Sequence, residues 1–350
     1  FQEEELQKLI LMIQKAIKTQ ELIFVYGDYD VDGMTSTAMM ASFLKECGAQ
    51  VDYYIPNRFT DGYGLSETII ERLKKKEYKY LFTLDCGITN IKEITQIKKE
   101  INCQIAILDH HTIPKTPPPA DIIINPKSLT EDHPFWDLCT AGIVYKVIEY
   151  YCKKTNTQLN VESFLDLVAL GTIADIAQMK GENRYLTKLG LSILNQRKRA
   201  GIYYLLEEAK FKKEFISSRD VGFAIAPKLN AAGRLDHAQV CVDLLITKSK
   251  ETAQIIAKNL ISLNQKRQQI GQNMLIESVK YIEKSAPDTQ NKTITIAGPN
   301  WHSGIIGITA SQLANKYNYQ NRIFTFKDNE IISAVVDNPS VSLGNMLRNL

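Results

Sequence analysis

Short apolar runs alternate with helical patterns through the first 110 residues, and this alternation restricts the fold more than any other feature of the chain. The apolar runs cover residues 22–26, 51–55, 80–84 and 104–108. Helical spacing covers residues 6–18, about 35–47, 66–76 and 91–100. Strands and helices in this order are typical of a mostly parallel sheet. Such a sheet places functional residues in the loops beyond the carboxyl ends of its strands.

The remainder of the chain predicts a helical region and then a second α/β unit. Residues 140–246 look mainly helical, and Ser249 is expected to be the N-cap of one long helix that ends near Lys284. About 35 helical residues span ~50 Å, which suits a spacer between two domains. Apolar runs at 293–297 and 322–326 predict strands of the second unit.

Composition excludes several classes of protein. The chain of 350 residues is 44% hydrophobic and 23% charged, which is ordinary globular usage. No apolar run approaches the ~18–20 residues of a membrane span, so no membrane partner is expected. Six cysteines without a C-x-x-C pair indicate a reducing compartment, and hence the cytoplasm. A net charge of +3 alone does not indicate a nucleic-acid partner.

Three aspartates, Asp28, Asp30 and Asp32, follow the first apolar run within five residues. Carboxylates this close repel one another unless a cation gathers them, and carboxylate oxygens suit Mg²⁺ or Mn²⁺. An EF-hand calcium loop begins with the same spacing, but its twelfth position would fall on Met39 in place of the required glutamate. An acidic turn in solvent is the alternative that this motif alone leaves open.

Further acids and a histidine pair follow later apolar runs. Asp85 comes directly after residues 80–84, where a helix cap is the alternative role. Asp109, His110 and His111 follow residues 104–108. One imidazole can bind a metal while its neighbour faces the substrate, and Asp109 can fix a tautomer. A polar turn is the alternative reading of this group.

A lone carboxylate, Asp175, ends an otherwise apolar segment, and a buried unpaired carboxylate is expensive. A cation or strong donors are therefore expected beside it. The complete set of candidate metal ligands is Asp28, Asp30, Asp32, Asp85, His110 and Asp175. This oxygen-rich set suits two Mn²⁺ or Mg²⁺ ions ~3.5–4 Å apart, which activate water for attack on phosphorus. The residues alone therefore predict a metal-dependent phosphoester or phosphoanhydride hydrolase.

The same segments resemble, in the same order, the four motifs of the DHH phosphoesterase superfamily, at residues 28–33, 85, 109–111 and 174–175. Within it the chain resembles the RecJ-type single-stranded-DNA-specific exonucleases, also at residues 55–64, 125–127, 139–142, 182–184, 226–234, 263–267 and 301–308. The resemblance implies an α/β fold with a mostly parallel DHH domain over residues 1–248, whose part from about 140 is helical. A long connecting helix (249–285) would lead to a smaller α/β DHHA1 domain (286–350). That domain would be incomplete and without the OB-fold of longer relatives.

The resemblance also implies roles for individual residues. Asp28, Asp30 and Asp85 would hold one metal ion, and Asp32, Asp85, His110 and Asp175 the other. His111 would contact the scissile phosphate, with Asp109 as the second catalytic residue. The implied substrate-binding residues are Arg58, Asn230, Gly233, Arg234, Asn264, Arg267, His302 and Ser333. A surface salt bridge is the alternative for Arg58 and Arg234, and a buried one for Arg267.

The implied activity is 5′→3′ digestion of single-stranded DNA to 5′ mononucleotides in DNA repair or recombination. The implied partners are single-stranded DNA and repair or replication proteins, such as a single-strand-binding protein or a helicase, with the chain acting as a monomer. Val335 stands where this family is expected to carry an arginine for the 5′ phosphate. The alternatives are a DHH phosphodiesterase acting on short oligonucleotides or cyclic dinucleotides, and a non-catalytic RecJ-like scaffold.

Overall fold

The computed structural model describes residues 1–62, 64–285, 293–317, 320–327 and 330–336. It divides into two compact units, Phe1–Ile261 and Ser262–Leu350. The boundary falls inside the long helix, so each unit carries part of that helix. The domain limits expected from the sequence stay a prediction.

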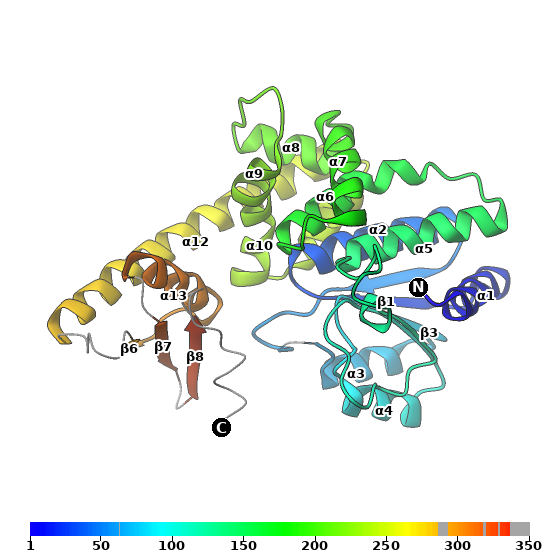
Figure 1. Ribbon diagram of the computed structural model, residues 1–350, viewed down its shortest axis with the longest axis horizontal. Coiled ribbons are helices and arrows are strands. Elements are labelled where there is room, and N and C mark those ends of the chain that lie inside the picture. Colours follow the sequence, from blue (N-terminus) through cyan, green and yellow to red (C-terminus); the bar gives the residue numbers. More distant parts are fainter. Residues whose placement is uncertain (63, 286–292, 318–319, 328–329, 337–350) are drawn as a thin grey trace. The chain divides into compact units, whose positions relative to one another are not determined.

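Five parallel strands form the sheet of the first unit, in the order β2-β1-β3-β4-β5 (Figure 1). Their bounds are β1 (Ile23–Gly27), β2 (Val51–Tyr54), β3 (Tyr80–Leu84), β4 (Gln104–Leu108) and β5 (Ile122–Ile124). All residues of β1 and β3 are buried, as expected for strands covered on both faces. In this strand order the chain reverses its direction of travel across the sheet between β1 and β3, and ligands of such folds bind at that point.

Helices cover both faces of this sheet. On one face α3 (Glu67–Lys75) and α4 (Ile91–Glu100) pack through apolar side chains against strand residues such as Phe24, Leu81 and Ile105. On the other side lie α1 (Glu3–Thr19), α2 (Val31–Glu46) and α5 (Thr140–Thr155) (Figure 1). The sheet is therefore a rigid platform, and its carboxyl edge is held between two helical layers.

The region after the sheet is helical, as predicted. Its elements are η1 (Pro126–Ser128), η2 (Val161–Phe164), α6 (Leu165–Ala174), α7 (Gly181–Asn195), α8 (Ala200–Glu208), α9 (Ser218–Asp220), η3 (Val221–Ile225), α10 (Ala226–Leu235) and α11 (Gln239–Ile246). Helix α6 packs against α2, α5 and α7 and is almost wholly buried. Its C-terminal end is thereby fixed next to the first turn of α2.

The long helix α12 (Lys250–Ser285) begins where the sequence predicts, because the Thr252 amide donates to Ser249 Oγ at 3.2 Å. The second unit also contains β6 (Thr293–Pro299), α13 (Ser303–Tyr317), β7 (Gln320–Lys327) and β8 (Glu330–Val336). Strands β6 and β7 are parallel, whereas β7 and β8 are antiparallel. The predicted α/β fold with a mostly parallel sheet and a long helix is confirmed. No helix in the described part of the chain is apolar over enough of its length to cross a membrane.

One local prediction was wrong, and one strand was not predicted. Helix α2 was expected from about Thr35 but begins at Val31, because Asp30 caps it by accepting from the Gly33 amide at 3.0 Å. In the acidic segment, Asp28 therefore follows strand β1, Asp30 is the N-cap of α2, and Asp32 lies in the first turn of that helix. Negative charge is favoured at a helix N-terminus. Strand β5 was not predicted, because a three-residue run is too short to show a period.

Candidate metal centre

The register of the parallel strands brings the acidic residues together at one edge of the sheet. Each of three aspartates directly follows a strand and continues its hydrogen-bonding ladder. The Asp28 amide donates to Leu84 O, the Asp85 amide to Leu108 O, and the Asp109 amide to Ile124 O. Asp28 and Asp85 therefore flank the reversal point between β1 and β3.

One group of carboxylates is formed by Asp28, Asp30 and Asp85, whose ligand atoms lie within 4.8 Å of one another. Asp28 is buried, and its Oδ1 has no hydrogen-bond partner among the described residues. Burial raises the pKa of Asp28 to about 7, and the charge of Asp30 adds to this rise. A buried oxygen without a donor among the described residues, beside two other carboxylates, fits a cation site.

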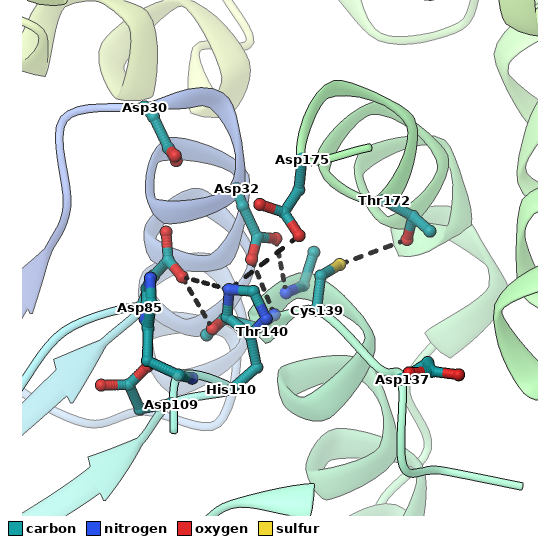
Figure 2. Close-up of polar contacts among 12 residues, drawn as sticks. Asp30, Asp32, Asp85, Asp109, His110, Asp137, Cys139, Thr140, Thr172 and Asp175 are labelled. Atoms are coloured by element: carbon teal, nitrogen blue, oxygen red, sulfur yellow. Dashed lines mark hydrogen bonds and ion pairs between the residues drawn. The ribbon is translucent and has the colours of Figure 1, made fainter. Parts of the chain in front are cut away.

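A second group is formed by Asp32, His110 and Asp175, again within 4.8 Å (Figure 2). Burial raises the pKa of Asp175 to about 7, with Asp32 and Asp30 as further causes. Burial also lowers the pKa of His110, which favours the neutral imidazole that metals bind. His110 Nε2 lies 3.9 Å from Asp175 Oδ2 and 3.2 Å from Asp85 Oδ1, so Asp85 adjoins both groups.

Asp85 is held in an uncommon backbone conformation, with φ at +63°. Asp and Asn adopt this left-handed region more readily than most residues. The Thr140 hydroxyl donates to Asp85 Oδ1 at 3.1 Å (Figure 2). Burial and the charges of Asp30, Asp32 and Asp28 raise the pKa of Asp85 well above its usual range. The turn thus fixes this carboxylate at the centre of the acidic cluster.

Asp109 lies behind the histidine pair rather than in either group of ligand atoms. Its Oδ1 lies 2.7 Å from His111 Nδ1, and its Oδ2 accepts from the Ile88 amide at 3.1 Å. Burial alone would raise the pKa of Asp109, but its hydrogen bonds with His111 lower it overall. The same hydrogen bond raises the pKa of the His111 imidazole. Asp109 therefore orients His111, whose Nε2 faces away from it.

These residues fit a pair of Mn²⁺ or Mg²⁺ ions. The donor set is rich in carboxylate oxygen with one imidazole nitrogen, which those ions accept. The unpartnered Asp28 Oδ1 and the raised pKa values of Asp28, Asp85 and Asp175 are signs of negative charge crowded without compensation. All six ligands expected from the sequence lie in the two groups.

Four of the expected substrate-binding residues belong to the first unit. Arg58 lies over the Tyr29 ring at 4.3 Å, and its Nε has no hydrogen-bond partner in the described part of the chain. Asn230, Gly233 and Arg234 lie on α10. A Cβ on Gly233 would lie 2.5 Å from the Tyr29 carbonyl oxygen, so only glycine lets α10 approach the acidic segment this closely.

The other four belong to the second unit. Arg267 Nη2 donates to Asn264 Oδ1 at 2.8 Å, whereas its buried Nε has no partner among the residues described. A buried salt bridge, the alternative for Arg267, is not among the ion pairs of the described residues. His302 precedes α13, and its Nδ1 accepts from the Gly304 amide at 3.2 Å. Ser333 pairs with Phe324 through the β8 backbone, and its side chain lies outside the described residues.

Sequence reasoning missed the donors that hold Asp32. The amides of Thr140 and Ala141, at the start of α5, donate to its two carboxylate oxygens at 2.7 and 2.8 Å (Figure 2). The helix N-terminus thus stabilises negative charge at this end of the cluster. The only signal in the sequence was the segment 139–142, which resembles the family without showing a chemical reason.

Comparisons with known proteins agree with this architecture. Residues 22–172 match the model of the DHH family, N-terminal domain. The single-stranded-DNA-specific exonuclease RecJ of Haemophilus influenzae is 36% identical over 324 residues, covering 89% of this chain and 56% of the relative. RecJ of Bacillus subtilis is 34% identical over 305 residues, covering 87% of this chain and 38% of the relative.

The chain thus spans about two fifths to somewhat more than half of the length of these curated relatives. A crystal structure of exonuclease RecJ bound to manganese superposes with a TM-score of 0.83 at 31% identity. That match covers 98% of this chain and 84% of the solved chain. On the strength of this likeness over nearly the whole length of both, the chain belongs to the RecJ family of DHH proteins.

Proposed function

We propose that the chain is the catalytic core of a single-stranded-DNA-specific 5′→3′ exonuclease that releases 5′ mononucleotides. The observation that carries this proposal is the pair of ligand groups that adjoin at Asp85, at the reversal point of the sheet. Solved relatives bound to manganese or magnesium, and curated relatives described as single-stranded-DNA-specific exonucleases, support it.

We assign Asp28, Asp30 and Asp85 to one Mn²⁺ or Mg²⁺ ion and Asp32, Asp85, His110 and Asp175 to the other. When bound, such a pair supplies charge neutralisation and an activated water for in-line attack on phosphorus. The Thr140 hydroxyl and the α5 amides keep Asp85 and Asp32 in their ligating orientations.

His111 donates to a non-bridging oxygen of the scissile phosphate in this proposal. Asp109 Oδ1 lies 2.7 Å from His111 Nδ1 and raises the pKa of this imidazole. In its protonated form the ring stabilises the charge that develops on the phosphate. Asp109 acts through His111, as a positioning residue.

The other proposed substrate-binding residues hold the single-stranded DNA. Arg58, Asn230, Gly233 and Arg234 form one phosphate-binding wall, in which the buried Nε of Arg58 is a donor without a protein acceptor among the described residues. We also assign Asn264, Arg267, His302 and Ser333 to strand binding, as residues of the second unit and of a DHHA1 domain. Six free cysteines fit a reducing compartment such as the cytoplasm. The chain would act as a monomer, with a single-strand-binding protein or a helicase as its protein partner.

One experiment separates this function from its alternatives. A 5′-phosphorylated single strand, the corresponding duplex and a dinucleotide, all labelled, are incubated with the Mn²⁺-loaded chain. Mononucleotides released progressively from the 5′ end of the single strand alone are the expected result. Cleavage restricted to di- and trinucleotides would instead assign a short-oligonucleotide phosphodiesterase. Strand binding without cleavage would assign a scaffold, and digestion from the 3′ end would contradict the proposed polarity.

A further inference from the structure

Two large apolar side chains, Ile176 and Phe223, are the most exposed of their kind in the described part of the chain. Ile176 is 88% exposed and Phe223 is 81% exposed. Ile176 directly follows Asp175, a member of the second ligand group. Phe223 lies on η3, which packs against the C-terminal part of α6: a Cβ on Gly222 would lie 3.9 Å from Ile173 Cγ2.

The backbone at Ile176 is the less expected of the two features. Its amide donates to Ile173 O and the Ala177 amide donates to Thr172 O, both at 3.2 Å, which closes α6 with a Schellman motif. That motif needs a left-handed residue after the C-cap, and Ile176 has φ at +58°. Glycine normally occupies this position, because a β-branched side chain is strained there. Packing does not explain an isoleucine whose side chain is in solvent.

Phe223 also stands at an irregular turn. Residues Val221–Ile225 form a π-helical turn, in which Val221 and Ile225 are buried while Phe223 points outward. Turns of this kind are frequent at functional sites. A buried anchor on each side therefore fixes an exposed phenyl ring next to the helix that carries Asp175.

We propose that Ile176 and Phe223 form an apolar platform for the nucleobases of the single strand whose phosphate lies at the metal centre, an inference that rests on the proposed function. Ile176 directly follows Asp175, the C-cap of α6, and η3 with Phe223 packs against the same helix. Unpaired bases present apolar faces that stack on aromatic rings irrespective of sequence. In a duplex those faces are covered by neighbouring base pairs, so the platform would contribute to selection of single strands.

Exposed apolar residues elsewhere in the first unit provide matched controls. Ile255, on α12, is 69% exposed, and Tyr203, on α8, is 41% exposed. Neither lies on α6 or on η3. Replacing them removes exposed apolar area from a surface that the proposal does not use.

The test compares a 5′-phosphorylated oligothymidylate with a strand of equal length built from abasic residues. Binding is measured by fluorescence anisotropy with Ca²⁺ in place of Mn²⁺, and strand integrity is checked on a gel. We expect the unsubstituted chain to bind the base-bearing strand roughly tenfold more tightly. Phe223→Ala and Ile176→Asn should bring this ratio to within about twofold of one by weakening only the base-bearing complex. Ile255→Ala and Tyr203→Ala should leave the ratio unchanged.

A ratio near one for the unsubstituted chain, or an unchanged ratio in both platform variants, overturns the proposal. The asparagine variant guards against misfolding, because asparagine tolerates the left-handed region and should keep or raise the melting temperature. Failure of the Mn²⁺-loaded chain to cleave either strand would refute the proposed function, while the anisotropy ratio would still decide on the platform. If the variants change the molar mass in solution and not the ratio, the patch is a protein contact.

Discussion

Asp85 can be tested without disturbing its backbone, because asparagine accepts a φ of +63° almost as readily as aspartate. Asp85→Asn removes one buried charge that adjoins both ligand groups. We expect cleavage to fall by more than ~100-fold, beyond the usual loss for an outer-shell partner. The metal-free variant should melt at a higher temperature than the unsubstituted chain, since like charges are no longer crowded.

Mn²⁺ affinity by calorimetry, cleavage rate and melting temperature in EDTA provide the three measurements for this variant. Asp132→Asn is the matched control, because Asp132 is an exposed aspartate outside both ligand groups. Unchanged Mn²⁺ affinity in Asp85→Asn would contradict a bridging role for this carboxylate.

Gly233 tests how closely α10 must approach the acidic segment. Gly233→Ala places a Cβ 2.5 Å from the Tyr29 carbonyl oxygen, so the backbone between Asp28 and Asp30 has to move. We expect a loss of ~1–3 kcal/mol in the free energy of unfolding, as for overpacking elsewhere, together with weaker Mn²⁺ binding. Urea denaturation and Mn²⁺ titration measure the two effects.

Gly307→Ala on α13 is the control for that substitution, because nothing lies within 4 Å of the added Cβ. Alanine there should stabilise the helix by roughly 0.5–1 kcal/mol. Equal behaviour of the two variants would show that the contact with Tyr29 is unimportant.

At the scale of secondary structure, apolar runs predicted the four long parallel strands to within about a residue or two. Strands β1, β3 and, after its first residue, β4 are buried on both faces, so their composition alone identifies them, whereas the edge strand β2 is half-buried. The acids at their ends were predicted because charge is conspicuous after such runs. The start of α2 was missed because Asp30 is both the N-cap of this helix and the middle of three closely spaced aspartates. The sequence suggested a metal ligand at this position and gave no separate sign of a helix cap.

The donors to Asp32 were beyond prediction for a different reason. Backbone amides have no signature in the sequence, and Thr140 lies 108 positions from Asp32. Only the packing of α5 against α2 brings them together. The candidate ligands of this site can therefore be predicted from residue types, whereas the groups that orient them depend on the fold.

The start of α5 yields a prediction of its own. Thr140→Val keeps the size of the side chain but removes the hydroxyl that donates to Asp85 at 3.1 Å. We expect Mn²⁺ affinity or cleavage to fall by ~10–100-fold, as for other outer-shell partners of metal ligands. Thr140→Ser keeps the hydroxyl and should retain most of the activity. Full activity in Thr140→Val would contradict a role for this hydrogen bond, and a loss confined to Thr140→Ser would point to the packing of the methyl group.

The net charge of +3 is a sum over the whole molecule and does not describe the local charge at the candidate metal centre. The acids of the cluster lie within a few ångströms of one another, so their repulsion is local. Two divalent ions would add four positive charges there and leave the protein clearly basic. A net charge close to zero in the metal-free chain is thus compatible with a polyanionic substrate once the metal ions are bound.

The crowded acids also make the metal-free protein sensitive to pH. Asp28 and Asp175 have pKa values of about 7 in the folded chain, against 3.8 for an unperturbed aspartate. Between these values the folded state holds more protons than the unfolded state, so stability falls as pH rises and levels off above about pH 7. Metal ions require the deprotonated carboxylates and compensate their charge, so the ions compete with these protons.

We therefore expect the melting temperature in EDTA to fall, relative to that with saturating Mn²⁺, as the pH is raised from 5 to 8. Scanning calorimetry at both pH values, with and without Mn²⁺, measures this difference. Other titrating groups contribute to both forms and cancel in the comparison, which isolates the acids that Mn²⁺ neutralises. Equal stabilisation by Mn²⁺ at pH 5 and pH 8 would mean that these two carboxylates do not bind the ion, and the ligand assignment would have to be given up.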